Sequence, residues 1–113
     1  MNDLQEMSDG TIDIDTPRGD AIGLTRHKFI YGSYLCKSSD YIYISFIASA
    51  KRGNFRVLVK RILDSGLGVK VPTPLARMEQ IVRKAGYTHT IETDEMYGQV
   101  EVWVLEPSSS QKR

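Results

Sequence analysis

The passage from Tyr41 to Val71 constrains the fold of this chain more than any other stretch. It opens with an apolar run, YIYISFIA at 41–48, and closes with a shorter one, LGVKV at 67–71. Between them, apolar residues recur at the spacing of a helix that buries one stripe: Phe55, Leu58, Val59, Ile62 and Leu63. A strand, a helix and a second strand in this order predict a right-handed crossover within one sheet. The chain is therefore expected to adopt an α/β (α+β) fold.

Flanking segments extend the predicted sheet on both sides of this unit. Turn signals and runs of β-forming residues predict strands at 27–36, 41–48, 67–71, 87–93 and 99–106. Apolar periodicity predicts two helices, at 55–63 and 74–85. The expected order is β-β-α-β-α-β-β, which describes a mixed, largely antiparallel sheet with two helices. Because both faces of 41–48 are apolar, this strand is expected to be central and covered on both sides.

The remaining segments set the predicted domain limits. TIDID at 11–15 is expected to form a short edge strand, and TPRGD at 16–20 a loop, because proline and glycine interrupt regular structure. Residues 1–10 are predicted to be a disordered acidic arm and residues 107–113 a disordered tail. A single domain is therefore expected over residues 11–106.

Charge and composition narrow the function classes. The chain has 113 residues, a net charge of +1 and one cysteine, Cys36, so neither a strong general attraction to nucleic acid nor an intrachain disulfide is expected. No apolar run approaches the roughly 20 residues that span a bilayer, which argues against a membrane partner, and the expected location is cytoplasmic. Two distant histidines and one cysteine have no metal-ligand spacing, so no metal site is predicted.

The passage from Tyr41 to Tyr87 resembles the C-terminal half of the GNAT superfamily of N-acetyltransferases. The residues that carry the resemblance are the strand YIYISFIA, the loop AKRGN, the helix FRVLVKRILDSG, the strand VKVP and the helix TPLARMEQIVRKAGY. Lys84, Gly86 and Tyr87 look like the family's Lys-x-Gly-aromatic ending, and QVEVWVLE fits the last strand of its closing hairpin. The resemblance implies a GNAT-like domain that lacks the family's N-terminal helices.

The resemblance also implies a cofactor, acetyl-CoA, and a set of binding residues. Lys51, Arg52, Gly53 and Asn54 would hold the pyrophosphate at the turn between strand and helix, and Phe46, Ile47 and Ala48 would supply backbone contacts to the pantetheine arm. The physical reason is that free N–H groups and the dipole at a helix start favour an anion. The implied activity is acyl-CoA binding and transfer of an acetyl group to an amine. No catalytic residue is assigned.

Several departures from the family pattern favour an alternative function. Phe55 stands where the family loop has a second small residue, Ala50 where it has Arg or Gln, and Val82 where it often has a tyrosine acid. The alternative is a catalytically inactive GNAT-fold protein that binds a protein partner, such as a phage-encoded accessory protein or inhibitor of a host protein. A sheet without its leading helices would also expose apolar area, which predicts a homodimer.

Two further interpretations remain beside these. A basic segment at 51–61 makes nucleic-acid binding a weaker third hypothesis, against which the near-neutral net charge argues. Glu95 and Tyr97 could supply acid or base chemistry, but their place in a predicted hairpin turn favours simple exposure.

Overall fold

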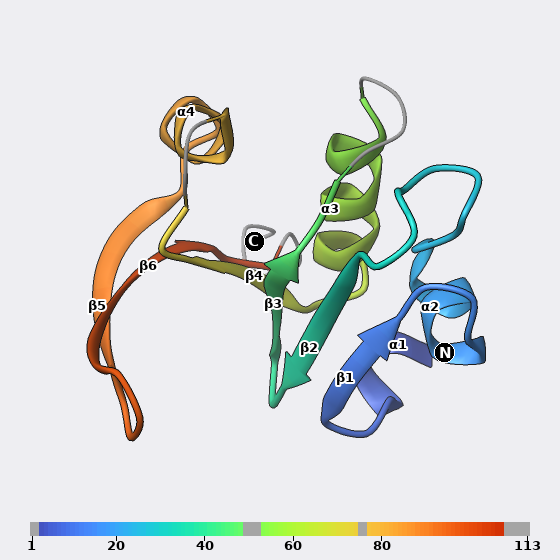
Figure 1. Ribbon diagram of the computed structural model, residues 1–113, viewed down its shortest axis with the longest axis horizontal. Coiled ribbons are helices and arrows are strands. Elements are labelled where there is room, and N and C mark those ends of the chain that lie inside the picture. Colours follow the sequence, from blue (N-terminus) through green and yellow to red (C-terminus); the bar gives the residue numbers. More distant parts are fainter. Residues whose placement is uncertain (1–2, 49–52, 75–76, 108–113) are drawn as a thin grey trace.

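A computed structural model describes residues 3–48, 53–74 and 77–107, and within them a six-stranded mixed sheet and four helices (Figure 1). The strands are β1 (Gly10–Asp13), β2 (Tyr34–Ser38), β3 (Tyr41–Phe46), β4 (Gly68–Pro72), β5 (Thr88–Asp94) and β6 (Gly98–Leu105). The helices are α1 (Asp3–Glu6), α2 (Pro17–Ile22), α3 (Asn54–Asp64) and α4 (Arg77–Lys84). None of the described helices is long and apolar enough to span a membrane.

The strands lie side by side in the order β1-β2-β3-β4-β6-β5. Only β3 and β4 pair in parallel, joined by α3 as the crossover, while every other neighbouring pair is antiparallel. The predicted α/β class and mixed, largely antiparallel sheet are confirmed. From β2 onward the elements follow the predicted order along the chain. The prediction of two helices missed α1 and α2, which flank β1 in sequence.

One face of the sheet carries the core. The strand registers place Ile12 beside Leu35, Leu35 beside Ile44, and Ile42 beside Val69, so these side chains share a face. Buried helix residues join the same cluster: Leu4 from α1, Ile22 from α2, Leu58, Val59 and Ile62 from α3, and Val82 from α4. The helices therefore pack on one side of the sheet.

The opposite face carries Tyr43, Lys70 and Val102, and none of the described helices packs on it. Val102 is buried, yet it lies outside the core cluster. Long side chains from the strands themselves shield this face, since Tyr43 is half-buried and Lys70 is only 17% exposed. The prediction that β3 is central is confirmed. The predicted cover on both sides comes from helices on one face and from aromatic and charged side chains of the sheet itself on the other.

The TPRGD segment, predicted as a loop, begins helix α2. Thr16 caps the helix by accepting a hydrogen bond at Oγ1 from the Gly19 N–H at 3.0 Å, and Pro17 occupies the first turn, where its missing N–H costs nothing. Gly23 ends the helix in the left-handed conformation, at φ 93°. Pro17 and Gly23 therefore mark the two ends of this short helix, and Gly19 lies on its buried face.

The predicted strand at 27–36 is shifted, because β2 begins only at Tyr34. Before it, Phe29 turns into the core at 1% exposure, and its N–H bonds to the Thr25 carbonyl oxygen at 2.9 Å. A turn from Ile30 to Ser33 follows, with a hydrogen bond of 3.0 Å between the Ser33 N–H and the Ile30 oxygen. Burial of one phenyl ring therefore outweighs the local preference for an extended strand.

The N-terminal segment is tied to the domain at two points. Leu4 of α1 is 3% exposed within the core, and the Arg18 Nη2 donates to the Ser8 carbonyl oxygen at 2.9 Å. The expected disorder of residues 1–10 concerns motion and stays a prediction. The predicted tail at 107–113 lies outside the described residues except for Pro107.

Candidate functional site

Gly53 is the one residue of the predicted phosphate turn before α3 that the structure describes, and it is the N-cap of the helix. Gly53 adopts φ 94°, and a Cβ built at this position would meet no atom within 4 Å. No described side chain caps α3, and its first turn carries no acidic residue, so its opening amide groups and dipole are free of a local counter-charge. Asn54 donates its side-chain amide to the Lys28 carbonyl oxygen at 2.7 Å, which fixes the 25–33 loop beside the turn. Lys51 and Arg52 lie outside the described residues.

The three residues expected to contact pantetheine are Phe46, which ends β3, and Ile47 and Ala48, which follow it. Phe46 is 50% exposed, and Ile47 is partly buried against the core. The Ala48 N–H donates to the Ser33 hydroxyl at 3.1 Å, and its carbonyl oxygen accepts from the Ile30 N–H at 2.7 Å. Because the N–H and the carbonyl oxygen of Ala48 both have hydrogen-bond partners, a ligand that hydrogen-bonds to this segment would use the residues that precede Ala48.

The ladder between β3 and β4 is shorter than either strand. Its pairs run from Tyr41 with Gly68 to Tyr43 with Lys70, whereas β3 continues to Phe46 and β4 to Pro72. β4 then leaves its line at Thr73, which has φ 40° and donates its N–H to the Glu101 oxygen at 2.7 Å. The β4 side of the last residues of β3 is therefore without a ladder partner among the described strands.

A polar cluster lies where this ladder ends, on the helix-free face. Lys70 donates from Nζ to Glu92 at 2.6 Å and to the Tyr43 hydroxyl at 3.3 Å, and the same hydroxyl donates to Glu92 at 3.0 Å. The Lys70 ammonium also lies 4.3 Å from the ring centre of Tyr41 and 5.3 Å from that of Tyr43. Tyr41 in turn donates to Glu106 at 2.9 Å. We call Tyr41, Tyr43, Lys70, Glu92 and Glu106 the sheet-face cluster.

Electrostatics fix the protonation of the sheet-face cluster near neutral pH. Partial burial lowers the pKa of Lys70, but its hydrogen bonds to Glu92 and Tyr43 outweigh burial and leave the pKa above its ordinary value. Burial raises the pKa of Tyr43, and Glu92 adds to that effect against the opposing influence of Lys70. The hydrogen bond to Glu106 raises the pKa of Tyr41. The cluster therefore presents an ammonium and two protonated phenols.

Removing the Glu92 charge tests whether the sheet-face cluster stabilises the fold. We expect Glu92→Gln to lower the free energy of unfolding by about 1 kcal/mol, because Lys70 then keeps its partly buried charge without a carboxylate. The matched control is Glu79→Gln, which breaks the exposed pair of Glu79 with Arg83 at 3.0 Å and should cost less than about 0.5 kcal/mol. Urea unfolding at neutral pH measures both. Equal losses would show that Lys70 and Glu92 behave as a surface pair.

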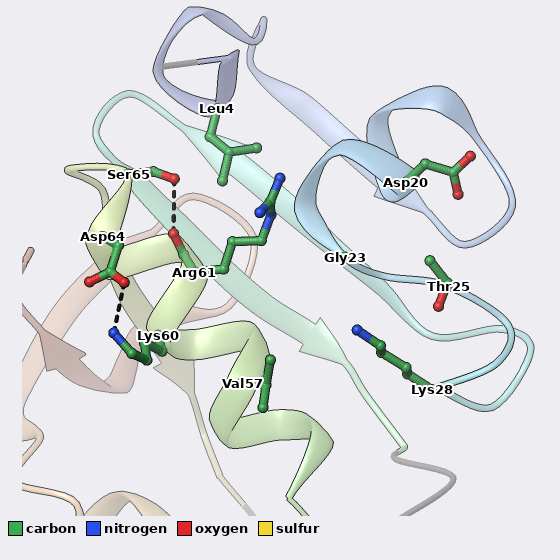
Figure 2. A pocket seen from close by; sticks show the side chains of 10 residues that line it. All are labelled: Leu4, Asp20, Gly23, Thr25, Lys28, Val57, Lys60, Arg61, Asp64 and Ser65. Carbon is green, nitrogen blue, oxygen red and sulfur yellow. Dashed lines mark hydrogen bonds and ion pairs between the residues drawn. The ribbon is translucent and has the colours of Figure 1, made fainter. Parts of the chain in front are cut away.

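A groove of about 790 Å³ lies on the other side of the molecule, between α2 and α3 (Figure 2). Its lining includes Leu4, Asp20, Gly23, Thr25, Lys28, Val57, Lys60, Arg61, Asp64 and Ser65. Lys60 pairs with Asp64 at 2.9 Å, and the Arg61 guanidinium donates to the Ala21 carbonyl oxygen at 2.6 Å. The charged groups of Lys60 and Arg61 are thus bonded within the chain. This argues against anion binding in the groove and against nucleic-acid binding by α3.

His89, which as a histidine could act as a general base, and the hairpin residue Tyr97 lie outside the sheet-face cluster. His89 lies 3.6 Å from Glu101 and edge-on to Trp103, and Glu101 accepts from the Trp103 ring N–H at 2.9 Å. Tyr97 is 77% exposed in the hairpin turn, which confirms the expectation of simple exposure. In the described residues, no group of three or more His, Cys, Asp and Glu side chains is arranged to hold a metal ion.

Comparison with known proteins adds no relative. A scan against protein-family models, a search of curated proteins and a search of solved structures each gave no match for this chain.

Sequence reasoning did not find the sheet-face cluster. Tyr43, Lys70 and Glu92 lie 27 and 22 residues apart along the chain, and no motif joins them. One signal was present for Lys70, which is the one charged residue of the otherwise apolar strand LGVKV at 67–71. Turning that signal into a cluster requires the parallel register of β3 with β4 and the place of β6 between β4 and β5.

Proposed function

We propose that this chain binds acyl-CoA in the manner that its resemblance to the GNAT superfamily implies. The observation that carries the proposal is the short ladder between β3 and β4, which stops at Tyr43 and Lys70 while both strands continue. The order β3, α3, β4, α4, β5, β6 supports it, since a strand, a helix, a strand, a helix and a hairpin are what the resemblance predicts.

The pantetheine arm would lie along the unpaired side of β3. An extended arm that carries amide groups can hydrogen-bond to a free strand edge as an added strand does. The backbone at the end of β3, at Phe46 and the following Ile47, is suited to this role, because the Ala48 N–H is bonded to Ser33. Phe46 is 50% exposed, so its side chain is not enclosed by the domain and leaves space for the arm beside the strand.

The pyrophosphate would lie at the start of α3. Gly53 offers an open approach, and the first amide groups of α3 point at the position an anion would take. Lys51 and Arg52 precede Gly53 in sequence and add positive charge to the same turn. A helix of eleven residues has a dipole large enough to favour the anion.

Acetyl transfer would use the groups at the ladder's end. The amine attacks the thioester carbonyl carbon, the carbonyl oxygen gains negative charge, and a backbone N–H near Ile47 stabilises it. The C–S bond then breaks, the thiolate takes up a proton, and the nitrogen of the new amide releases its extra proton to water. Val82, at the position where the family often has a tyrosine acid, is fully buried. Tyr43, protonated at neutral pH, is the candidate donor in its place.

A second function has its own supporting observation. The loop before β2 and the end of β3 expose a set of large apolar side chains: Ile30, Tyr31, Tyr34 and Phe46. Tyr34 and Phe46 are register partners, and the Ile30 N–H bonds to Ala48, so the set is local. Such a patch fits a protein partner, which is the role expected of an inactive GNAT-fold binding protein.

Calorimetric titration with acetyl-CoA tests the first function. We expect binding by the unaltered chain and binding at least about tenfold weaker by Gly53→Trp, because an indole at the turn blocks the approach of a pyrophosphate. The matched control is Gly98→Trp, since Gly98 also has positive φ and open space around it but lies in the β5–β6 turn. The control should bind as the unaltered chain does.

The absence of binding at millimolar acetyl-CoA would remove the acyl-CoA proposal and leave the protein-binding function. Equal weakening by both tryptophan variants would remove the placement of the pyrophosphate at Gly53, because the loss would then come from backbone strain at a left-handed glycine and not from the turn.

A further inference from the structure

Strand β5 forms an outer edge of the sheet, and its burial pattern is that of an uncovered strand. It pairs with β6 on one side, and no other described strand pairs with it. Its seven residues, THTIETD, contain no proline or lysine of the kind that discourages edge pairing. Ile91, at its centre, is 51% exposed. A long edge with an exposed β-branched residue is a template for another strand.

We propose that β5 pairs antiparallel with β5 of a second copy of this chain, about a twofold axis at Ile91. The sequence of the strand is self-complementary in that register. Ile91 faces Ile91 of the second copy, Thr90 faces Glu92, His89 faces Thr93, and Thr88 faces Asp94. Each acid therefore lies opposite a hydroxyl and the two exposed isoleucines cover each other, which is the self-matching that a twofold interface requires.

Registers shifted toward the C-terminal end of β5 are less favourable. A shift of the axis to Glu92 sets the two Glu92 carboxylates opposite each other, and a shift to Thr93 sets Glu92 opposite Asp94. Like charges directly opposite each other destabilise a strand pair. Glu92 is also held by Lys70 and Tyr43 on its own sheet, so its position is fixed before a second copy arrives.

Charge outside the strand favours the same arrangement. The segment 85–107 contains five acidic residues and no Lys or Arg, whereas Arg83 and Lys84 end α4 just before it. In the Ile91 register, the acidic turn that follows Asp94 in one copy extends toward the C-terminal end of α4 in the other. The exposed Met96 and Tyr97 belong to that turn and extend toward the same end of α4. Opposite charges therefore meet at both ends of the paired strands.

The oligomeric state of the full chain tests the pairing. We expect sedimentation at micromolar concentration to give twice the 12.8 kDa chain mass, and Ile91→Lys to weaken dimerisation at least about tenfold, because two ammonium groups then meet at the axis. The matched control is Ile30→Lys, since Ile30 is 50% exposed but lies in the loop before β2. It should leave the dimer intact.

Disulfide trapping tests the register. In a Cys36→Ser background, Ile91→Cys should form an intermolecular disulfide on mild oxidation, because facing Cα atoms about 5 Å apart suit the bond. Thr93→Cys should not, since its copies would lie four residues, or roughly 13 Å, apart along the strand direction. A monomer at all concentrations, a dimer unaffected by Ile91→Lys, or equal cross-linking of the two cysteine variants would overturn the proposal.

Discussion

Replacement of Gly19 by alanine is expected to lower the free energy of unfolding by about 3 kcal/mol, although the same change in an isolated helix stabilises it by roughly 0.5–1 kcal/mol. Gly19 is buried on the face of α2 that packs on β1. A Cβ there would fall inside contact distance of the Asp13 carbonyl oxygen and lie 3.1 Å from that of Leu24. Both atoms belong to the backbone, so neither can move aside as a flexible side chain would.

The measurement is urea unfolding of Gly19→Ala beside the control Asp20→Ala. Asp20 is the next residue of α2 and is exposed, so its replacement should change stability by no more than about 0.5 kcal/mol. Stabilisation by Gly19→Ala would contradict the close approach of α2 to β1. That result would indicate that residues 16–20 form the loop that Pro17 and Gly19 predict.

The α2 segment shows why part of the fold could not be predicted from local pattern. Pro17 and Gly19 are poor helix residues on average, and the reason for each here is positional: Pro17 fills the first turn, and Gly19 permits a close contact with β1. Nothing within TPRGD reports that contact. By contrast, the α3 stripe and the alternation in β6 carry their own periodicity, and both elements lie where the sequence predicts them.

The candidate site residues also divide into those that a local pattern predicts and those that need the tertiary structure. Gly53 and Asn54 belong to one continuous turn, so a sequence pattern can find them. Tyr43, Lys70 and Glu92 meet only because β3 and β4 pair in parallel and β6 enters between β4 and β5. Local patterns predict a contiguous phosphate turn, whereas a cluster assembled across three strands requires the topology first.

Alkaline pH is expected to destabilise the protein through Tyr87, the residue of the Gly-aromatic pair. Tyr87 is 7% exposed in the core, and burial raises its pKa to about 12. In the unfolded chain the phenol titrates near its ordinary value of about 10. Because the folded state holds the proton more tightly, this contribution is complete below about pH 10 and is lost as the pH rises toward 12.

The expected loss from Tyr87 is about 2 kcal/mol between about pH 9 and pH 11.5, since one pKa unit corresponds to about 1.4 kcal/mol. Urea unfolding of the unaltered chain and of Tyr87→Phe at both pH values measures it. The phenylalanine variant has no proton to lose at this position, so its stability should fall by about 2 kcal/mol less, while lysines and the other tyrosines contribute equally to both chains. Tyr41→Phe serves as the control, because Tyr41 is more exposed and its pKa is raised mainly by its hydrogen bond to Glu106. If all three proteins lose the same stability, the Tyr87 side chain is not buried in the core at high pH.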